Sequence, residues 1–352
     1  MTIGEDRVGA VARSRPRLTA PTLEQVAALA GVSRSTASRA INGGLRVSTH
    51  AQASVDTAVA ELGFAPNRAA RSLVTRCANS VALVVPEPDE LVMSDPFFAA
   101  TISGLSSALS ETDLQLVLVM ARPSDIGTRT VRYLRGGHVD GVVVVSHHRD
   151  DILADELSRS CVPTVYVGRP LQGDHELPYV DVDNTLGGRL AAEYLVRIGR
   201  RRIGTIAGPQ DMSPGLDRLT GWSAALVAAG LTADAVAFGT DFTTAGGARA
   251  AERLLAEHPD VDAIFVASDL MAAGALGVLA AAGRRVPQDV AVIGYDNLWV
   301  ATSTSPPLTT ILNPVVAMAR AAGEMLLDLL AGLPPRPSPV IFAPQLVVRR
   351  ST

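Results

Sequence analysis

Before about residue 65, apolar residues recur in steps of three and four, the spacing of short amphipathic helices. The stretch TLEQVAALAG opens with a capping box, in which Thr22 and Gln25 satisfy free N–H groups of the first turn. Gly31 then supplies the left-handed conformation that ends a helix. A second helix is predicted from the cap residue Ser33 to about Ile41. The pattern therefore predicts two short helices joined at one glycine.

Two further helical signals complete this N-terminal region. STHAQASVDTAVAELG has apolar residues at i, i+3, i+4 and i+7 counted from Val55, and it ends at Gly63. The stretch FAPNRAARSLVTR, residues 64–76, carries a fourth signal, because Pro66 suits the first turn of a helix. Asn67–Leu73 is too short to be a stable helix alone, since nucleation costs more than two turns return. We therefore expect an all-helical head, followed by a short segment that becomes helical only when another contact stabilises it.

From Val81 onward the pattern changes to short apolar runs that alternate with helical stretches. Runs of this kind are typical of parallel strands covered on both faces, and their spacing of about 25–40 residues suits repeated strand–helix–strand units. A last strand is predicted in VIFAPQLVVRR. The runs form two series, VALVVPE, LQLVLVMA, GVVVVS and PTVYVG, then RIGTIAGP, AVAFGT, AIFVAS and VAVIGYDN. The prediction is an α/β body of two doubly wound lobes, with a ligand site between them at the carboxyl ends of the strands.

Composition narrows the class of protein. The 352 residues are 47% hydrophobic and 19% charged, which fits a globular protein of two or three domains. No apolar run approaches the roughly 18 residues of a membrane span, and the first residues lack the apolar core of a secretory signal. Cys77 and Cys161 have neither disulfide nor metal-like spacing. We therefore expect a cytoplasmic protein without membrane contact, metal or cofactor.

Charge is distributed unevenly along the chain. Residues 1–80 contain ten Arg against five Asp plus Glu, a net charge of +5, so the remainder carries −9 of the total of −4. A basic head on an acidic body suggests that the head meets a polyanion and the body does not. The chain has no lysine, which excludes a lysine-dependent phosphate loop or Schiff base.

The second predicted helix, SRSTASRAIN, has the residue types of a DNA-reading helix. Its small side chains would let it lie deep in the major groove, where Arg34 and Arg39 could reach guanine O6 and N7. Its other polar groups suit phosphates, which fix register without reading sequence. The alternative is an ordinary solvated helix face. The candidate phosphate contacts in this segment are Ser33, Thr36 and Asn42.

A wider set of motifs, this helix included, occurs in a fixed order along the chain. The stretches are TLEQVAALAGVSRSTASRAINGGLRVS, AVAELGFAPNRAARSL, DPFFAATISGL, HVDGVVVV, VPTVYVGRP, VDNTLGGRLAAEYL, FVASDLMAAGAL, RVPQDVAVIGYDN, PPLTTI and LVVRRST. Together they closely resemble the lactose-repressor (LacI/GalR) family of bacterial helix-turn-helix transcription regulators, over about residues 19–352. Two positions depart from the usual pattern: Ala37 replaces Val, and Asp95 stands where Asn is common before Pro-Phe-Phe.

The resemblance implies roles for the head and the linker. Arg34, Ser35 and Arg39 fall on the family's base-reading positions. Leu73 matches the apolar side chain that wedges into the minor groove and kinks the duplex, with the alternative that it packs on the body. Such regulators bind a pseudopalindromic operator as a homodimer, and the chain lacks the terminal heptad helix of tetrameric relatives. The linker residues expected near phosphates are Arg68 and Arg71.

Aromatic and charged residues after the strands predict an effector cleft, filled by a sugar whose C–H face stacks on aromatic rings. The resemblance implies an effector-anchoring arginine at Arg218 and a ligand carboxylate at Asp296. Core packing is the alternative for each aromatic residue: Phe97, Phe98, Trp222, Phe242, Tyr295 and Trp299. The effector-binding candidates are Asp95, Phe98, Arg169, Arg218, Phe242, Asp269 and Asp296.

These observations divide the chain into four predicted segments. Residues 1–18 form a disordered tail, 19–65 a DNA-binding domain, 66–79 a hinge helix and linker, and 80–352 an effector-binding and dimerisation domain. Within the last segment, lobe 1 comprises about 80–180 and 312–336, and lobe 2 about 181–311 and 337–352.

No catalytic set is recognisable. Neighbouring His147 and His148 point opposite ways in an extended chain, so we expect a polar loop rather than a metal site. Asp181 and Asp183 resemble a carboxylate pair, but Asp183 is expected to cap a helix. The prediction is a ligand-responsive repressor of carbohydrate genes. The alternatives are a purine- or nucleoside-responsive regulator, a sugar-binding transport protein and a sugar-processing enzyme, in that order.

Overall fold

The computed structural model describes residues 21–42, 47–64, 77–121, 129–150, 152–171, 177–334 and 336–352, with the backbone alone at Ala154. Its contacts divide the chain into two compact units, one ending at Arg76 and one beginning at Cys77. No helix among the described residues is long and apolar enough to cross a membrane.

The first unit contains three described helices, α1 (Leu23–Leu29), α2 (Arg34–Ile41) and α3 (Thr49–Leu62). Local sequence signals set their ends. The Thr22–Gln25 capping box is present, and Gly31 and Gly63 take positive φ angles of 65° and 61°. The helices enclose a small core of buried residues, Val26, Ala27, Ala37, Ala40, Val55 and Ala58. The three helices predicted from the sequence are confirmed, whereas the fourth signal, at 64–76, lies almost wholly outside the described residues.

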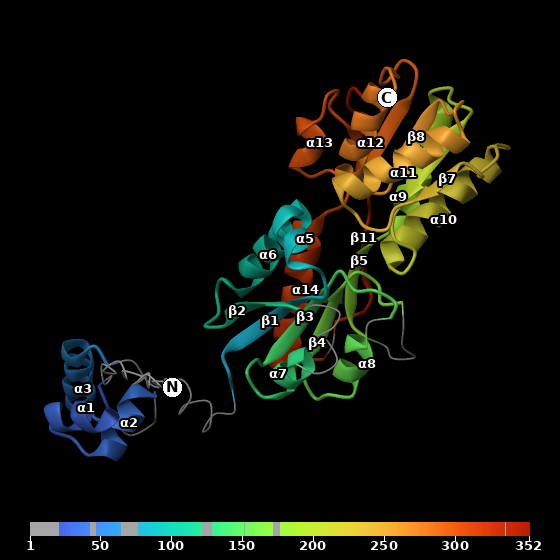
Figure 1. The fold of residues 1–352 in the computed structure, drawn as a ribbon. Helices are drawn as coiled ribbons and strands as arrows, with labels where there is room; N and C mark the ends of the chain where they lie inside the picture. The colour runs from blue at the N-terminus through green and yellow to red at the C-terminus, as the bar shows by residue number, and fades with distance from the viewer. Residues whose placement is uncertain are drawn as a thin grey trace, which may run out of the picture. The chain divides into compact units, whose positions relative to one another are not determined.

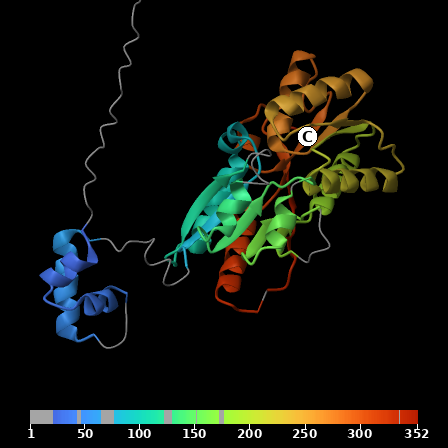
Figure 2. The same cartoon turned by 60° about the horizontal axis from the view of Figure 1, so that its bottom comes forward.

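The second unit contains two six-stranded sheets, each flanked by helices (Figures 1 and 2). The strand order of the first sheet is β11-β5-β4-β3-β1-β2, and its paired strands are parallel. Its strands are β1 (Ser80–Val85), β2 (Gln115–Met120), β3 (Gly141–Val145), β4 (Thr164–Val167), β5 (Tyr179–Val182) and β11 (Val340–Phe342). Its helices are α5 (Asp89–Ser94), α6 (Pro96–Leu109), α7 (Val131–Arg135), α8 (Leu153–Ser158) and α14 (Val315–Leu330).

Strand β1 shows why this sheet is covered on both faces. Val81, Leu83 and Val85 belong to the core that α6 and α14 complete, whereas Ala82 and Val84 belong to the core that α7 and α8 complete. Successive side chains of a strand point to opposite faces, so a continuous apolar run feeds both cores. The first lobe is therefore doubly wound, as the sequence predicts.

The second sheet has the order β12-β10-β9-β8-β6-β7, and only its edge strand β12 pairs antiparallel, with β10. Helices α9 and α10 cover one core of this lobe, and α11 and α12 cover the other. Its strands are β6 (Ile203–Ala207), β7 (Val236–Phe238), β8 (Ala263–Val266), β9 (Ala291–Asp296), β10 (Thr309–Leu312) and β12 (Gln345–Val347). Its helices are α9 (Asn184–Arg197), α10 (Ser213–Ala228), α11 (Thr244–Glu257), α12 (Asp269–Ala281) and α13 (Trp299–Ser303).

The chain passes between the lobes after β5, after β10 and between β11 and β12. The last crossing corrects the predicted boundary at residue 337, because residues 340–342 pair with β5 in the first sheet. The single strand predicted in VIFAPQLVVRR is likewise two strands, one in each sheet. Apolar content was the same on both sides of Ala343–Pro344, so it could not reveal the break.

Helices α9 and α10 approach each other closely enough to exclude a side chain between them. A Cβ atom at Gly188 would meet the carbonyl group of Arg218, and one at Gly221 would meet that of Thr185. Asp183 caps α9 by accepting the N–H of Leu186 at 2.8 Å, which confirms its predicted structural role. The contact holds Arg218 beside the start of α9.

Candidate functional site

In the helical unit, α2 presents its predicted base-reading residues to solvent. Arg34, Ser35 and Arg39 are exposed, while Ala37 and Ala40 on the other side of the helix are buried. The Nε atom of Arg34 lies 2.8 Å from Glu24 Oε1, and Arg39 Nε donates to the carbonyl of Ser35 at 3.2 Å. The three side chains thus lie together on one accessible polar surface.

The predicted phosphate contacts lie at the two ends of α2. Ser33 caps the helix, and its Oγ accepts the N–H of Thr36 at 3.1 Å and lies 2.8 Å from the hydroxyl of Thr36. At the other end, Asn42 Nδ2 donates to the Ser38 carbonyl at 2.8 Å. Of the remaining DNA candidates, Arg68, Arg71 and Leu73 lie outside the described residues.

In the second unit, a cavity lies between the lobes at the carboxyl ends of the strands. The space between its walls, open solvent at the mouth included, is about 1080 Å³. The residues that follow six strands line it: Glu87 after β1, Ser146–His148 after β3, Gly168 after β4, Pro209 after β6, Thr240–Phe242 after β7 and Ser268 after β8. Among the predicted effector residues, Asp95, Phe98, Arg218, Phe242, Asp269 and Asp296 line the cavity.

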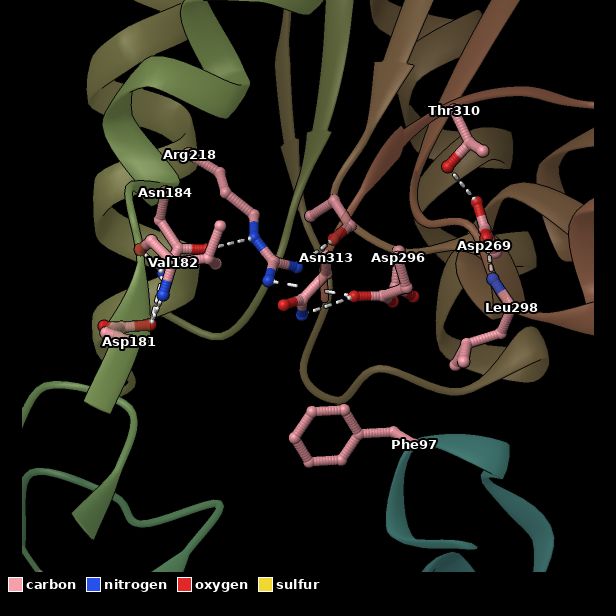
Figure 3. A network of polar contacts seen from close by, with 12 residues as sticks. Phe97, Asp181, Val182, Asn184, Arg218, Asp269, Asp296, Leu298, Thr310 and Asn313 are labelled. Atoms are coloured by element: carbon pink, nitrogen blue, oxygen red, sulfur yellow. Dashed lines mark hydrogen bonds and ion pairs between the residues drawn. The ribbon is translucent and has the colours of Figure 1, made fainter. Parts of the chain in front are cut away.

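Arg218 is the centre of the polar network in the cavity (Figure 3). It is only 5% exposed. Its Nε donates to Asn184 Oδ1 at 2.9 Å, its Nη1 donates to the carbonyl of Ala267 at 2.6 Å, and its Nη2 lies 3.9 Å from Asp296 Oδ1. The guanidinium carbon also lies 3.6 Å from the ring centroid of Tyr295. Arg218 is therefore held on four sides, and its charge is directed at Asp296.

Asp296 ends β9 in an unusual backbone conformation, with φ of 109°. A positive φ is costly for a residue with a side chain and is found mostly at functional sites. Its Oδ1 accepts Nδ2 of Asn313 at 3.2 Å. Burial raises the pKa of Asp296 above its usual value, against the lowering effect of Arg218. Holding this carboxyl in the cavity wall therefore costs both backbone conformational energy and desolvation energy.

Asp269 supports the same corner of the cavity from the start of α12. Its Oδ1 accepts the Thr310 hydroxyl at 2.6 Å, and its Oδ2 accepts the N–H of Leu298 at 3.2 Å (Figure 3). Burial, and then the charge of Asp296, hold the pKa of Asp269 well above its usual value. With both oxygens bonded inside the protein, Asp269 mainly positions the loop after Asp296.

On the lobe 1 side, Asp95 and two aromatic rings complete the wall. Asp95 caps α6, and its Oδ1 accepts the N–H of Phe97 at 2.9 Å. Burial raises the pKa of Asp95 to about 7. Phe98 is buried, and its ring is in edge contact with that of Phe97. Phe242 approaches from lobe 2, with its ring centroid 5.9 Å from the guanidinium carbon of Arg218. The cavity thus pairs aromatic surfaces with hydrogen-bonding carboxyl groups.

His148 joins the two lobes at the cavity. Its Nε2 lies 3.1 Å from Glu87 Oε1 in lobe 1, and its Nδ1 lies 2.8 Å from Asp211 Oδ2 in lobe 2. The hydrogen bond to Glu87 raises the pKa of His148 to about 9, so the ring is cationic at neutral pH. Burial lowers the pKa of the adjacent His147 to about 4. The predicted polar loop is thus an interlobe contact, and no metal-binding cluster occurs among the described residues.

Four candidates lie outside the cavity. Arg169 points to α10, where its Nη2 donates to both carboxyl oxygens of Asp217 at 2.8 Å. Trp222 is fully buried in the lobe 2 core, and Tyr295 lies beneath Arg218 rather than at the surface of the cavity. Trp299 is 65% exposed. These three aromatic residues do not line the cavity, because position after a strand does not fix side-chain direction. Trp222 and Tyr295 instead pack in the lobe 2 core, as the alternative given for each aromatic residue predicts.

Four polar residues at or beside the cavity were missed from the sequence. Glu87 follows β1, Asn313 follows β10 and Ser213 begins α10, and all three line the cavity, whereas Asn184, after β5, lies behind it and accepts from Arg218 Nε. Asn313 Oδ1 and Ser213 Oγ are buried and have no hydrogen-bond partner among the described residues. A polar residue soon after an apolar strand was the available signal. This signal is weak, because polar residues are common in loops of every kind.

Comparisons with known proteins agree with this geometry. The family model described as bacterial regulatory proteins, lacI family, matches residues 22–67, and a periplasmic binding protein-like domain matches residues 192–352. The chain is 48% identical to the HTH-type transcriptional regulator CelR of Thermobifida fusca, over 94% of this chain and 98% of that protein.

Two solved structures share the whole architecture. A complex of the transcriptional regulator CelR with cellobiose matches with a TM-score of 0.76 and 46% identity, covering 94% of this chain and 100% of that one. The lac repressor dimer bound to operator and the anti-inducer ONPF matches with a TM-score of 0.82 and 27% identity, covering 94% and 98%. The chain is therefore not an enzyme but a DNA-binding transcriptional regulator, and it belongs to the lacI family of bacterial regulatory proteins.

Proposed function

We propose that this regulator represses transcription by binding a pseudopalindromic operator as a homodimer, and that a sugar held in the interlobe cavity controls the binding. The observation that carries the proposal is the combination, in one chain, of an exposed Arg34–Ser35–Arg39 surface and an interlobe cavity lined by Arg218, aromatic rings and carboxyl groups. Residues 19–65 would read the operator, 66–79 would form the hinge, and 80–352 would bind the effector and dimerise.

The head would divide its contacts between bases and phosphates. Arg34, Ser35 and Arg39 would face base edges, since arginine pairs best with guanine O6 and N7. Leu73 would enter the minor groove between paired hinge segments and kink the duplex. The residues proposed for phosphates are Ser33, Thr36, Asn42, Arg68 and Arg71.

Sequence reading is tested by a change of specificity. Selection of operators from a random duplex library should give a twofold-symmetric site, and exchanging Arg34 and Ser35 should redirect preference within each half-site. Each lost bidentate contact should reduce discrimination by about 1–3 kcal/mol. Equal weakening on every sequence would assign these residues to phosphate binding instead. Binding should also weaken steeply with salt, because phosphate contacts release counterions.

For the effector we propose a cellobiose-like disaccharide. The cellobiose complex of CelR supports this choice, as does the aromatic and carboxyl lining of the cavity. Asp95, Phe98, Arg218, Phe242, Asp269 and Asp296 would form the site. Arg169 remains a proposed contributor, acting through its ion pair with Asp217 on α10.

A thermal-shift screen of sugars, nucleosides and purines tests the effector. A ligand at 100 times its Kd should add roughly 2.7 kcal/mol of apparent stability. The shift should disappear in Arg218→Ala and Asp296→Asn, because both remove groups that shape the same corner of the cavity. A ligand that still stabilises both variants would place the effector site elsewhere, and a purine as the best ligand would replace the sugar proposal.

A further inference from the structure

The cavity wall carries a strong excess of acidic groups. Arg218 is the only guanidinium that lines it among the described residues, and His148 is the other cation. Six carboxyl groups line the same cavity: Glu87, Asp95, Asp181, Asp241, Asp269 and Asp296. The cavity lining therefore contains more acidic than basic side chains.

Both cations are already engaged by the protein. Arg218 uses Nε on Asn184 and Nη1 on Ala267, and its remaining nitrogen faces Asp296. Each ring nitrogen of His148 faces a carboxylate, one in each lobe. An anionic ligand would therefore have to compete with built-in carboxylates for every positive charge in the wall.

The cavity lining contains polar atoms that have no hydrogen-bond partner in the described part of the chain. Asn313 Oδ1 is a buried acceptor of this kind, and Ser213 Oγ is a buried hydroxyl that can either accept or donate. Both residues are more than nine-tenths buried. Asp95 bonds Phe97 through Oδ1 alone, so its second oxygen accepts no hydrogen bond from the described part of the chain. Hydroxyl groups supply donors to such acceptors, whereas ionised phosphate and carboxylate groups supply none.

We propose that the cavity selects its ligand by charge: it binds uncharged sugars and rejects the same sugars when they carry a phosphate or a carboxylate. The proposal rests on the proposed role of the cavity as the effector site, and it adds a rule of specificity. Asp95 is the specificity-determining residue of this chain, since its carboxyl lines the cavity and, among the described residues, only its Oδ1 is used by the fold, to cap α6. A sugar would therefore be sensed before any kinase or oxidase has acted on it.

The test uses the full chain and a matched pair of ligands. Cellobiitol and cellobionate share the same open-chain end and differ by a CH2OH group against a carboxylate. Calorimetry at pH 8, above the pKa of about 7 that burial gives Asp95, should give cellobionate a Kd at least ~100-fold higher than that of cellobiitol, because like charges brought together in a partly buried site repel strongly. In Asp95→Asn, whose amide oxygen can still accept from Phe97, this ratio should fall by about tenfold. In Glu193→Gln, which removes a carboxylate of α9 outside the cavity, the ratio should not change.

A wider set of pairs separates this rule from the choice of sugar. Glucose and glucose 6-phosphate, ribose and ribose 5-phosphate, and adenosine and AMP are compared by thermal shift. If cellobiose and cellobiitol do not bind, but another neutral compound binds and its anionic partner does not, the sugar assignment is wrong and the charge rule holds. An anion that binds within tenfold of its neutral partner overturns the rule. A set in which nothing binds counts against both proposals.

Discussion

Replacing Arg218 with methionine should destabilise the body by an amount that depends on pH. The substitution keeps an unbranched side chain of similar length and removes the buried cation. Asn184 Oδ1 and the carbonyl of Ala267 then lose their donors, and each buried unsatisfied acceptor costs about 1–3 kcal/mol. Asp296 also loses its partner, which costs up to about 3–5 kcal/mol when a buried carboxylate stays charged. Asp296 can take up a proton instead, so we expect a total of about 3–5 kcal/mol at pH 7.

The sign of the pH dependence follows from Asp296. Its pKa is already raised by burial, and Arg218 opposes that rise. In Arg218→Met the opposing charge is gone, so the folded-state pKa of Asp296 rises further above its unfolded value. The folded variant then holds a proton that the unfolded chain releases, and its stability falls as pH rises above about 4. The stability deficit relative to the unsubstituted chain should therefore be larger at pH 8 than at pH 5.

Urea unfolding of the full chain at pH 5 and pH 8 measures both quantities, with the midpoint and slope fitted for the transition of the body. Arg189→Met on α9 is the matched control, because Arg189 is half-exposed and lies 3.7 Å from Glu193; surface pairs of this kind contribute about 0–1 kcal/mol. A deficit for Arg218→Met below about 1 kcal/mol, or one that is equal at the two pH values, would refute the reasoning.

Three further predictions concern the lobes and the head. His148→Gln should lower the melting temperature at pH 6, and the difference from the unsubstituted chain should shrink as pH rises from 6.5 through 9. The reason is that the pKa of His148 is raised to about 9 in the folded protein, so the stabilisation is lost as the ring deprotonates. A difference that stays constant with pH would argue against an ionic interlobe contact. Gly188→Ala should cost about 1–3 kcal/mol in urea unfolding and weaken effector binding by displacing Arg218, whereas Gly277→Ala, with open space at its Cβ position, should add up to about 1 kcal/mol. Ser33→Ala removes the α2 cap and should reduce amide-exchange protection in the head by about 0.5–2 kcal/mol without changing effector affinity.

The sequence by itself determined the elements whose signals are local. The first helix begins at the Thr22–Gln25 capping box and is followed by Gly31, and both features act within a few residues. Asp183 was identifiable as a cap because its partner is the N–H of Leu186, three residues away. The alternating use of β1 side chains by two cores follows from strand geometry alone. Such features need no knowledge of what lies across the fold.

The tertiary structure alone decided which residues meet in the cavity. Arg218 and Asn184 are 34 positions apart, and His148 and Asp211 are 63 apart. Arg169 and Asp217 pair across 48 positions, so an arginine expected in the cavity instead donates to a carboxylate on α10. Such pairings depend on the order of strands in each sheet, on the close approach of α9 and α10 at Gly188, and on three crossings between lobes. Residue type and spacing along the chain do not predict these contacts, because they are set by how the elements pack in the folded protein.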